Sequence, residues 1–328
     1  MSVTFQSKYL PVYAWFVTAF NILVIAWGAM VRATGSGAGC GNHWPQCNGA
    51  ILPELARIET VIEFSHRISS AFAGVFVVIL VLWVFRAARH PLARRAAVLS
   101  LVFIVMEGLL GALLVRLELV AGNTSALRAG AVALHLVNTL LLLTSLALTA
   151  RSSGNPAQSP RDAQSSRWLP WLLAIGLIAT ALLSAAGAVT ALGDTLFPAQ
   201  SLSAGLYTDL DPAANFLVRL RVVHPFLAVI TSLYLIMLSR YLLGAYTDPT
   251  IARTVKWLLA LVIVQVAAGV VNVLLLAPLW MQVVHLVLAD AVWITLVLLT
   301  AVSRTYCSES FKDGAPRTPG APSSLTQP

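Results

Sequence analysis

The sequence predicts an all-α integral membrane protein. Eight transmembrane helices are expected to form two pseudo-symmetric four-helix bundles, with both termini in the cytoplasm. Three observations support this fold class: an apolar composition, eight apolar segments of spanning length, and a repeat that relates the two halves of the chain. Of the 328 residues, 58% are hydrophobic and 10% are charged, which is far more apolar than a water-soluble domain of this size requires.

Each apolar segment is long enough to cross a bilayer. A helix needs about 20 residues to span the ~30 Å hydrocarbon core. Alternation with a period of two is absent, and a backbone in lipid must satisfy its own hydrogen bonds, so helices are the expected form. The expected spans are residues 11–31, 60–85, 96–115, 129–150, 168–192, 217–239, 257–277 and 282–303.

Basic residues set the expected orientation. Fourteen of the 21 Lys and Arg residues fall in the termini and the connections on one side of these spans. The other side carries most of the loop acids. The positive-inside rule therefore places both termini in the cytoplasm. Topology explains the net charge of +8, so nucleic-acid binding is not needed to account for it. No cleavable signal peptide is evident, and the first span is expected to be a retained anchor.

The two halves repeat at a near-constant offset. His66 matches His224 and Glu107 matches Gln265 at an offset of 158 residues, and the short motif at Gly28 recurs 159 residues later. Four spans in each half make the repeats parallel. We expect a first bundle at 1–152 with an outer loop at 33–59, and a second bundle at 168–306. A polar, Pro- and Ser-rich cytoplasmic linker (153–167) and a disordered cytoplasmic tail (307–328) complete the chain.

Four histidines lie on the even-numbered spans, near the same outer interface. His66 and His135 belong to the first half, and His224 and His285 to the second. Two histidines on facing helices are the usual axial pair for a haem iron, so the pattern indicates two haem sites. For a single histidine in a span, a hydrogen-bonded structural role would be the simpler interpretation. The symmetric arrangement of four favours haem ligation.

Basic residues near the histidines fit the same interpretation. Arg67 adjoins His66, Arg128 lies seven residues before His135, and Arg221 lies three before His224. Arginines at the polar edge of a haem can pair with its two propionates. Snorkelling of interfacial arginines explains any one of them equally well.

The halves differ in their acids. At the repeat offset, Glu63 corresponds to Arg221, so only the first half has a carboxylate beside a candidate ligand, with Glu63 and His66 on one helix face. A carboxylate inside a membrane is a functional-site hypothesis by default. The structural alternative is an ion pair between Glu63 and Arg67. Asp290, five residues past His285, is a weaker candidate.

The first outer loop contains Cys40 and Cys47. It faces an oxidising compartment, so a disulfide is plausible. Zinc bound by both cysteines and His43 would lack a fourth ligand. A redox-active cysteine pair is the third possibility.

These motifs closely resemble the haem A synthase family. The resemblance rests on the run GAMVRATGSG from Gly28, the loop CGNHWPQC from Cys40 and the string EFSHR from Glu63, and it extends through all eight spans. It implies a prokaryotic, multi-pass plasma-membrane enzyme that oxidises a methyl group of haem O to the formyl group of haem A by successive hydroxylations. Haem O synthase and the assembly of haem-copper terminal oxidases would be its functional partners.

The resemblance also assigns roles to residues. His66 and His135 would bracket the substrate haem, and His224 and His285 would hold a haem b cofactor. Glu63 would be the catalytic carboxylate, and Cys40 and Cys47 would form a disulfide. Arg32, inside the first motif, joins the propionate candidates Arg67, Arg128 and Arg221.

Three departures and two alternative functions accompany the resemblance. Glu107 stands where relatives commonly have glutamine, His43 is unusual in the cysteine loop, and the loop at 192–216 lacks a second cysteine pair. A di-haem electron-transfer protein of the cytochrome b type would need four histidines but not Glu63. A haem transporter or chaperone would use the ligands without the carboxylate.

Overall fold

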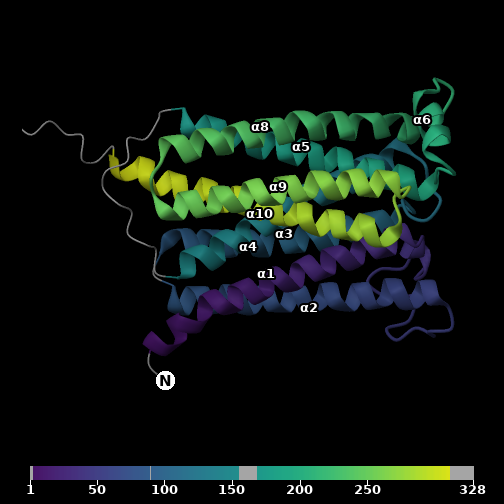
Figure 1. The fold of residues 1–328 in the computed structure, drawn as a ribbon. Coiled ribbons are helices and arrows are strands. Elements are labelled where there is room, and N and C mark those ends of the chain that lie inside the picture. Colours follow the sequence, from purple (N-terminus) through teal and green to yellow (C-terminus); the bar gives the residue numbers. More distant parts are fainter. Residues whose placement is uncertain (1–2, 89, 155–167, 311–328) are drawn as a thin grey trace, which may run out of the picture.

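The computed structural model describes residues 3–88, 90–154 and 168–310. Long helices run side by side along one direction (Figure 1), and no strand occurs in these ranges. Eight helical stretches among the described residues are long and apolar enough to cross a membrane, which confirms the all-α membrane fold class. The long helices are α1 (Val3–Ala33), α2 (Ile58–Ala87), α3 (Pro91–Arg116), α4 (Ala126–Ser153), α5 (Leu169–Leu196), α8 (Val223–Ala245), α9 (Pro249–Leu274) and α10 (Leu279–Ser310).

Local signals explain where several helices begin. Proline occupies the first position of α3 and α9, where a missing N–H costs nothing and the fixed φ suits a helix. Asp248 Oδ1 accepts the N–H groups of Thr250 and Ile251 at 2.8 and 2.9 Å, so its carboxylate caps α9. Ser125 caps α4 by accepting the N–H of Arg128 at 3.2 Å.

The connection between the fifth and sixth spans is more structured than the sequence predicts. Helix α5 continues to Leu196, and a short helix, α6 (Leu202–Leu210), follows. The sixth span is assembled from α7 (Phe216–Arg219), a 3-10 turn (Leu220–Val222) and α8. Pro225 lies in the first turn of α8, where its missing N–H is tolerated. The connection between α5 and α8 therefore contains two further short helices and a 3-10 turn.

Two helices run slightly past the predicted bundle boundaries, and the extents of the predicted linker and tail stay predictions. Helix α4 continues to Ser153 and α10 to Ser310, each beyond the expected end of its bundle. Residues 155–167 and 311–328 of the predicted linker and tail lie outside the described residues.

The helices pack with their sequence neighbours and across the two halves. Helix α1 packs against α2 and α4, and α3 packs against both α2 and α4; α5, α8, α9 and α10 make the corresponding contacts in the second half. Helix α4 also packs against α5 and α10. Trp293 on α10 fixes this junction, because its Nε1 donates to Leu140 O at 2.8 Å and to Thr144 Oγ1 at 3.0 Å. The two-bundle division, the pseudo-symmetry and the cytoplasmic placement of the termini stay predictions.

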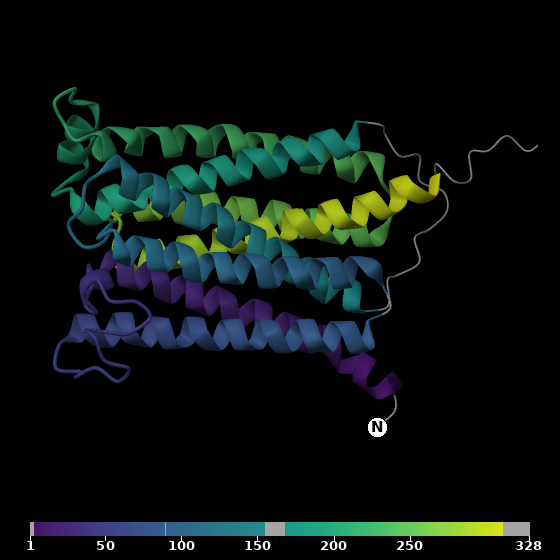
Figure 2. The same cartoon turned by 180° about the vertical axis from the view of Figure 1, so that it is seen from behind.

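Packing is uneven along the helices. The start of α1 and the end of α10 lie at one end of the bundle, whereas the loop after α1 and helix α6 lie at the other (Figures 1 and 2). Fully buried leucines fill the end with the helix termini, namely Leu10, Leu80 and Leu146 in the first half and Leu173, Leu242 and Leu258 in the second. The opposite end is hollow and holds the histidines.

Candidate functional site

All four candidate histidines line one cavity of about 1870 Å³. His66 lies on α2, His135 on α4, His224 on α8 and His285 on α10, each closer to the first residue of its helix than to the last. The rings of His224 and His285 have centroids 6.3 Å apart and planes 81° apart. Two metal–imidazole bonds of ~2 Å, plus about 1 Å from each ring centre to its nitrogen, require roughly this separation. The separation of these two rings is thus about the separation that one metal atom held between them would require.

Glycines on neighbouring helices face three of the rings. A Cβ added at Gly28 would lie 3.1 Å from His66 Cε1, one at Gly187 would lie 2.9 Å from His224 Cε1, and one at Gly269 would lie 3.1 Å from His285 Cε1. Glycine inside a helix costs about 1 kcal/mol relative to alanine. The close approach of each ring explains why glycine is used. The sequence carried this signal, since Gly28 and Gly187 are equivalent in the repeat, but their contact with the histidines was not predicted.

Three of the four histidines have a ring nitrogen without a protein partner in the described part of the chain. His66 Nδ1 and His285 Nδ1 are buried and have no hydrogen-bond partner among the described residues. His224 Nδ1 donates to Leu183 O at 3.2 Å, which leaves its Nε2 free to bind a metal. Buried, unpartnered nitrogens and glycine-lined walls fit a flat macrocycle with a central iron better than they fit a filled protein core.

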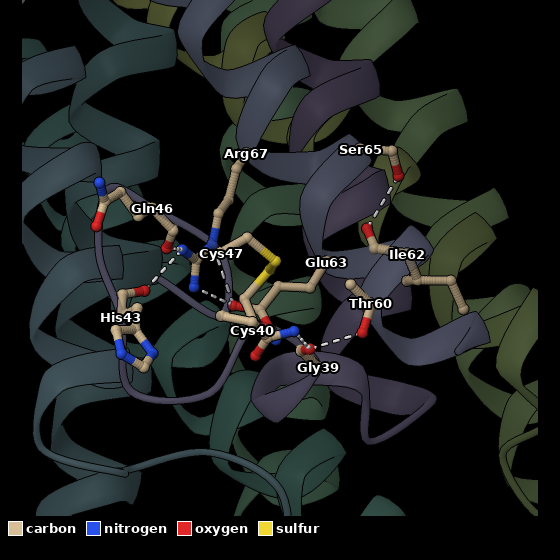
Figure 3. Close-up of a disulfide and its surroundings, with 11 residues drawn as sticks. Gly39, Cys40, His43, Gln46, Cys47, Thr60, Ile62, Glu63, Ser65 and Arg67 are labelled. Carbon is tan, nitrogen blue, oxygen red and sulfur yellow. Dashed lines mark hydrogen bonds and ion pairs between the residues drawn. A yellow bond between two sulfur atoms is a disulfide. The ribbon is translucent and has the colours of Figure 1, made fainter. Parts of the chain in front are cut away.

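Glu63 holds the cysteine loop to α2. Its Oε2 accepts the N–H of Cys40 at 2.8 Å, and its Oε1 accepts both Nε and Nη2 of Arg67. Arg67 Nη1 in turn donates to the carbonyls of His43 and Gln46 at 2.8 and 2.7 Å, so the loop is fixed from both sides (Figure 3). Glu63 is 3% exposed and lies on the cavity wall. The structural ion pair weighed at the sequence level is present, and a catalytic role for Glu63 stays a prediction.

The two loop cysteines form a disulfide. Cys40 and Cys47 are bonded, and both are almost completely buried. Their sulfurs are consequently unavailable as thiolate ligands, so the zinc alternative is wrong for this structure. No cluster of three metal-ligating side chains occurs among the described residues. The described contact of His43 with this site is made by its backbone carbonyl oxygen, which accepts a hydrogen bond from Arg67. The disulfide closes the loop that Glu63 anchors.

A second acid contacts a candidate ligand directly. His135 Nε2 donates to Glu107 Oε2 at 2.6 Å, between α4 and α3. The other oxygen of Glu107 accepts Asn138 Nδ2 at 2.6 Å and Thr139 Oγ1 at 3.1 Å. The sequence predicted a carboxylate beside a candidate ligand only in the first half, and Glu107 is a second such carboxylate in that half. Its contact with His135 was not predicted, because it joins two helices and depends on how each is rotated.

The candidate arginines have different partners. Arg32 reaches into the second half, where it donates to Ala191 O and Thr195 Oγ1 at 2.6 Å and to Gln282 Oε1 at 2.9 Å. Arg67 is occupied by Glu63 and the cysteine loop. All four candidate arginines line the cavity.

Arg221 and Arg128 are both buried. Arg221 pairs with Asp194 at 3.1 Å and with Asp209 at 3.4 Å. Arg128 donates through Nη1 to Ala121 O and Asn123 O, and its Nε has no partner among the described residues. Of these two guanidinium groups, Arg128 therefore has the more available donor for an anionic group.

Comparison with known proteins places the chain in a family. The model of the COX15-CtaA family, described as cytochrome oxidase assembly protein, matches residues 11–297. A protoheme IX farnesyltransferase of Thermus thermophilus is 46% identical over 291 residues, which are 88% of this chain and 47% of that protein. The chain thus spans about half the length of that relative.

Relatives that match shorter segments of the chain are named heme A synthase. A heme A synthase of Geobacillus kaustophilus is 45% identical over 102 residues, 30% of this chain and 32% of that protein. A heme A synthase of Halalkalibacterium halodurans is 38% identical over 152 residues, 45% of this chain and 49% of that protein. Because the family match covers most of the chain and reaches into all eight spans, the protein belongs to the COX15-CtaA family of cytochrome oxidase assembly proteins.

Proposed function

We propose that this protein is a haem A synthase, an oxidoreductase that converts a methyl group of haem O into the formyl group of haem A. The observation that carries the proposal is the set of four histidines on one membrane-embedded cavity, in a chain of an oxidase-assembly family. Relatives that match parts of the chain are named heme A synthase, which supports the same activity.

The two histidine pairs receive different roles. His66 and His135 bind the substrate haem O, and His224 and His285 hold a resident haem b. The buried ring nitrogens and the glycines beside the rings support these assignments. A bound haem b supplies one-electron transfer. Arg32, Arg67, Arg128 and Arg221 are the candidates that orient propionates, and the buried Nε of Arg128 has no partner among the described residues.

The chemistry requires a proton acceptor near the substrate. Converting a methyl group into a formyl group takes two two-electron oxidations, each of which replaces a C–H bond with a C–O bond. The resulting hydrate loses one water to leave the formyl group, and the four electrons pass to an oxidant outside the chain. Glu63 lines the cavity within one helical turn of His66 and is the proposed catalytic carboxylate. Its contacts with Cys40 N–H and Arg67 hold both carboxylate oxygens in place, so its position is fixed before substrate binds.

The substrate and product define the neighbouring reactions. Haem O must be supplied by a farnesyltransferase acting on protohaem, and a relative that this chain matches over 47% of its length carries that name. The product serves assembly of a terminal oxidase. We place the protein in the prokaryotic plasma membrane, with both termini in the cytoplasm and the haem sites toward the outer face, as the distribution of basic residues predicts.

Haem extraction tests the proposal. The chain would be expressed with a haem O synthase in cells that lack haem A, and the extracted haems would be identified by chromatography and mass. We expect haem A with some hydroxylated intermediate. Haem O alone would exclude the enzyme and leave the di-haem cytochrome or the haem transporter.

A further inference from the structure

Glu107 is bonded to the ring nitrogen that His135 would offer to iron. The contact from His135 Nε2 to Glu107 Oε2 is 2.6 Å. Asn138 Nδ2 donates to the other oxygen, and the Thr139 hydroxyl, 3.1 Å from the same oxygen, shares its one hydrogen between Glu107 and His135 O, which lies 3.0 Å away. Hydrogen bonds to an ionised acceptor are about twice as strong as neutral ones. Glu107 is thereby fixed, and it fixes the ring of His135.

The hydrogen bond from His135 Nε2 to Glu107 competes with coordination of iron by the same nitrogen. Nε2 is the imidazole nitrogen farther from the backbone, so it reaches a metal without the residue's own Cβ in the way. A nitrogen that carries a proton donated to a carboxylate has no lone pair to give to iron. His135 must therefore leave Glu107 before Nε2 can coordinate a haem.

The equivalent contact in the second half is weaker. Gln265 corresponds to Glu107, and its Nε2 lies 3.2 Å from His285 Nε2. Gln265 is neutral, and its Oε1 is without a partner in the described part of the chain. Leu288 and Ala289, which match Asn138 and Thr139 at the offset of the fourth spans, have no side-chain donor. Nothing comparable among the described residues locks Gln265.

The rings of His135 and His285 also lie in different positions relative to the neighbouring helix, as expected if only His135 is held by a carboxylate. A Cβ at Gly269 would lie 3.1 Å from His285 Cε1, whereas a Cβ at the equivalent Gly111 would meet no atom within 4 Å. His285 thus lies against the wall of α9, while His135 is absent from the matching place beside α3. The contact with Glu107 accounts for this displacement.

We propose that Glu107 is a positioning residue that restrains His135 from the iron, so that the first-half site exchanges its haem readily while the second-half site retains its own. The inference rests on the proposed function, because a substrate site must release its product and a cofactor site must not. Losing one hydrogen bond to a charged group corresponds to about a tenfold or larger change in an equilibrium or rate.

Haem release measures this restraint without turnover. The full chain in detergent, loaded with protohaem at both sites, would be mixed with excess apo-globin, and haem transfer followed by absorbance. His66→Ala identifies the phase that belongs to the first half. We expect Glu107→Gln to slow that phase about tenfold and to shift the first-half haem toward the six-coordinate low-spin spectrum. The mirror variant Gln265→Glu should accelerate release from the second half.

An unchanged or faster first-half phase in Glu107→Gln would overturn the proposal, since Glu107 would then support the ligand. Retention of the second-half haem spectrum shows that the variant is folded. If it is not folded, Asn138→Leu, which installs the residue type of the second half, should also slow the first phase. Haem A formation by the wild-type chain is measured separately, so the restraint and the proposed function can fail independently.

Discussion

The two halves hold their histidines in different surroundings. In the first half, the anchored disulfide loop contributes Trp44 and Pro45 to the cavity wall, Glu63 lies one turn from His66, and Glu107 binds His135. In the second half, the equivalent of Glu63 is Arg221, which is paired with Asp194 and Asp209, and the equivalent of Glu107 is the neutral Gln265. The positions of Glu63 and Glu107 thus hold acids in the first half, whereas the equivalent positions hold a basic and a neutral residue in the second half, where Asp290 is a buried acid on the cavity wall. This difference supports chemistry in the first half and retention of a cofactor in the second.

Replacing Glu63 should have the largest effect on the difference between the two halves. Glu63→Gln keeps an acceptor for Cys40 N–H but removes the charge and the proton acceptor. We expect haem A formation to fall by about 100-fold or more, as for loss of a general base, while the haem b spectrum persists. Haem analysis by mass and reduced-minus-oxidised spectra would measure both.

Glu59 provides the matched control for Glu63. It lies one turn earlier on α2 and forms an exposed ion pair with Arg57 at 3.5 Å. Glu59→Gln should therefore leave activity unchanged, because exposed ion pairs contribute little. Full activity in Glu63→Gln would remove this residue from the mechanism.

The glycine contacts offer a way to disturb either half alone. A Cβ at Gly187 would lie 2.9 Å from His224 Cε1, too close for that ring to keep its position. We expect Gly187→Ala to weaken haem binding in the second half by about tenfold, as a misplaced ligand loses a hydrogen-bond-sized contribution. Gly28→Ala, at 3.1 Å from His66 Cε1, should have a smaller effect confined to the first half.

Gly130→Ala serves as the control for these variants, because a Cβ there meets nothing within 4 Å. It should leave both haems in place. Haem content per protein would decide the outcome. Equal loss from both halves in Gly187→Ala would indicate general destabilisation rather than a local contact.

Removing the disulfide should have the smallest effect. Cys47→Ser opens a loop with a sequence separation of 7, which corresponds to about 2–3 kcal/mol of chain entropy. We expect a lower melting temperature and a several-fold loss of haem A formation, with an unchanged second-half haem spectrum. Cys307→Ser, at the third cysteine, should change none of these. A loss of the second-half haem in Cys47→Ser would contradict a role limited to the first half.

The positions of the membrane spans, and of the histidines within them, could be predicted from the sequence because hydropathy and residue spacing determine them. The eight expected segments all lie within the eight membrane-crossing stretches or within a few residues of their ends. Contacts between helices were harder to predict. The pairing of Glu107 with His135 and the approach of Gly187 to His224 depend on the rotation of each helix, and a single sequence does not encode that rotation visibly.

Loop structure was also missed. Helix α6 lies in a connection whose composition resembles an irregular loop, although Ser201 provides an N-cap by accepting Ala204 N–H at 3.1 Å. The cap was a readable signal. The anchoring of the cysteine loop by Arg67 through two backbone carbonyls was not readable, because carbonyl acceptors leave no trace in the side-chain sequence.

The division of labour between the halves is tested most directly by the haems that two matched variants retain. His135→Ala and His285→Ala would each be purified from cells that make haem O, and their haems identified by mass. His135→Ala should keep haem b and lose haem O and haem A, whereas His285→Ala should lose haem b, keep haem O and form no haem A. Haem O retained in His135→Ala and lost in His285→Ala would reverse the assignment and contradict the account.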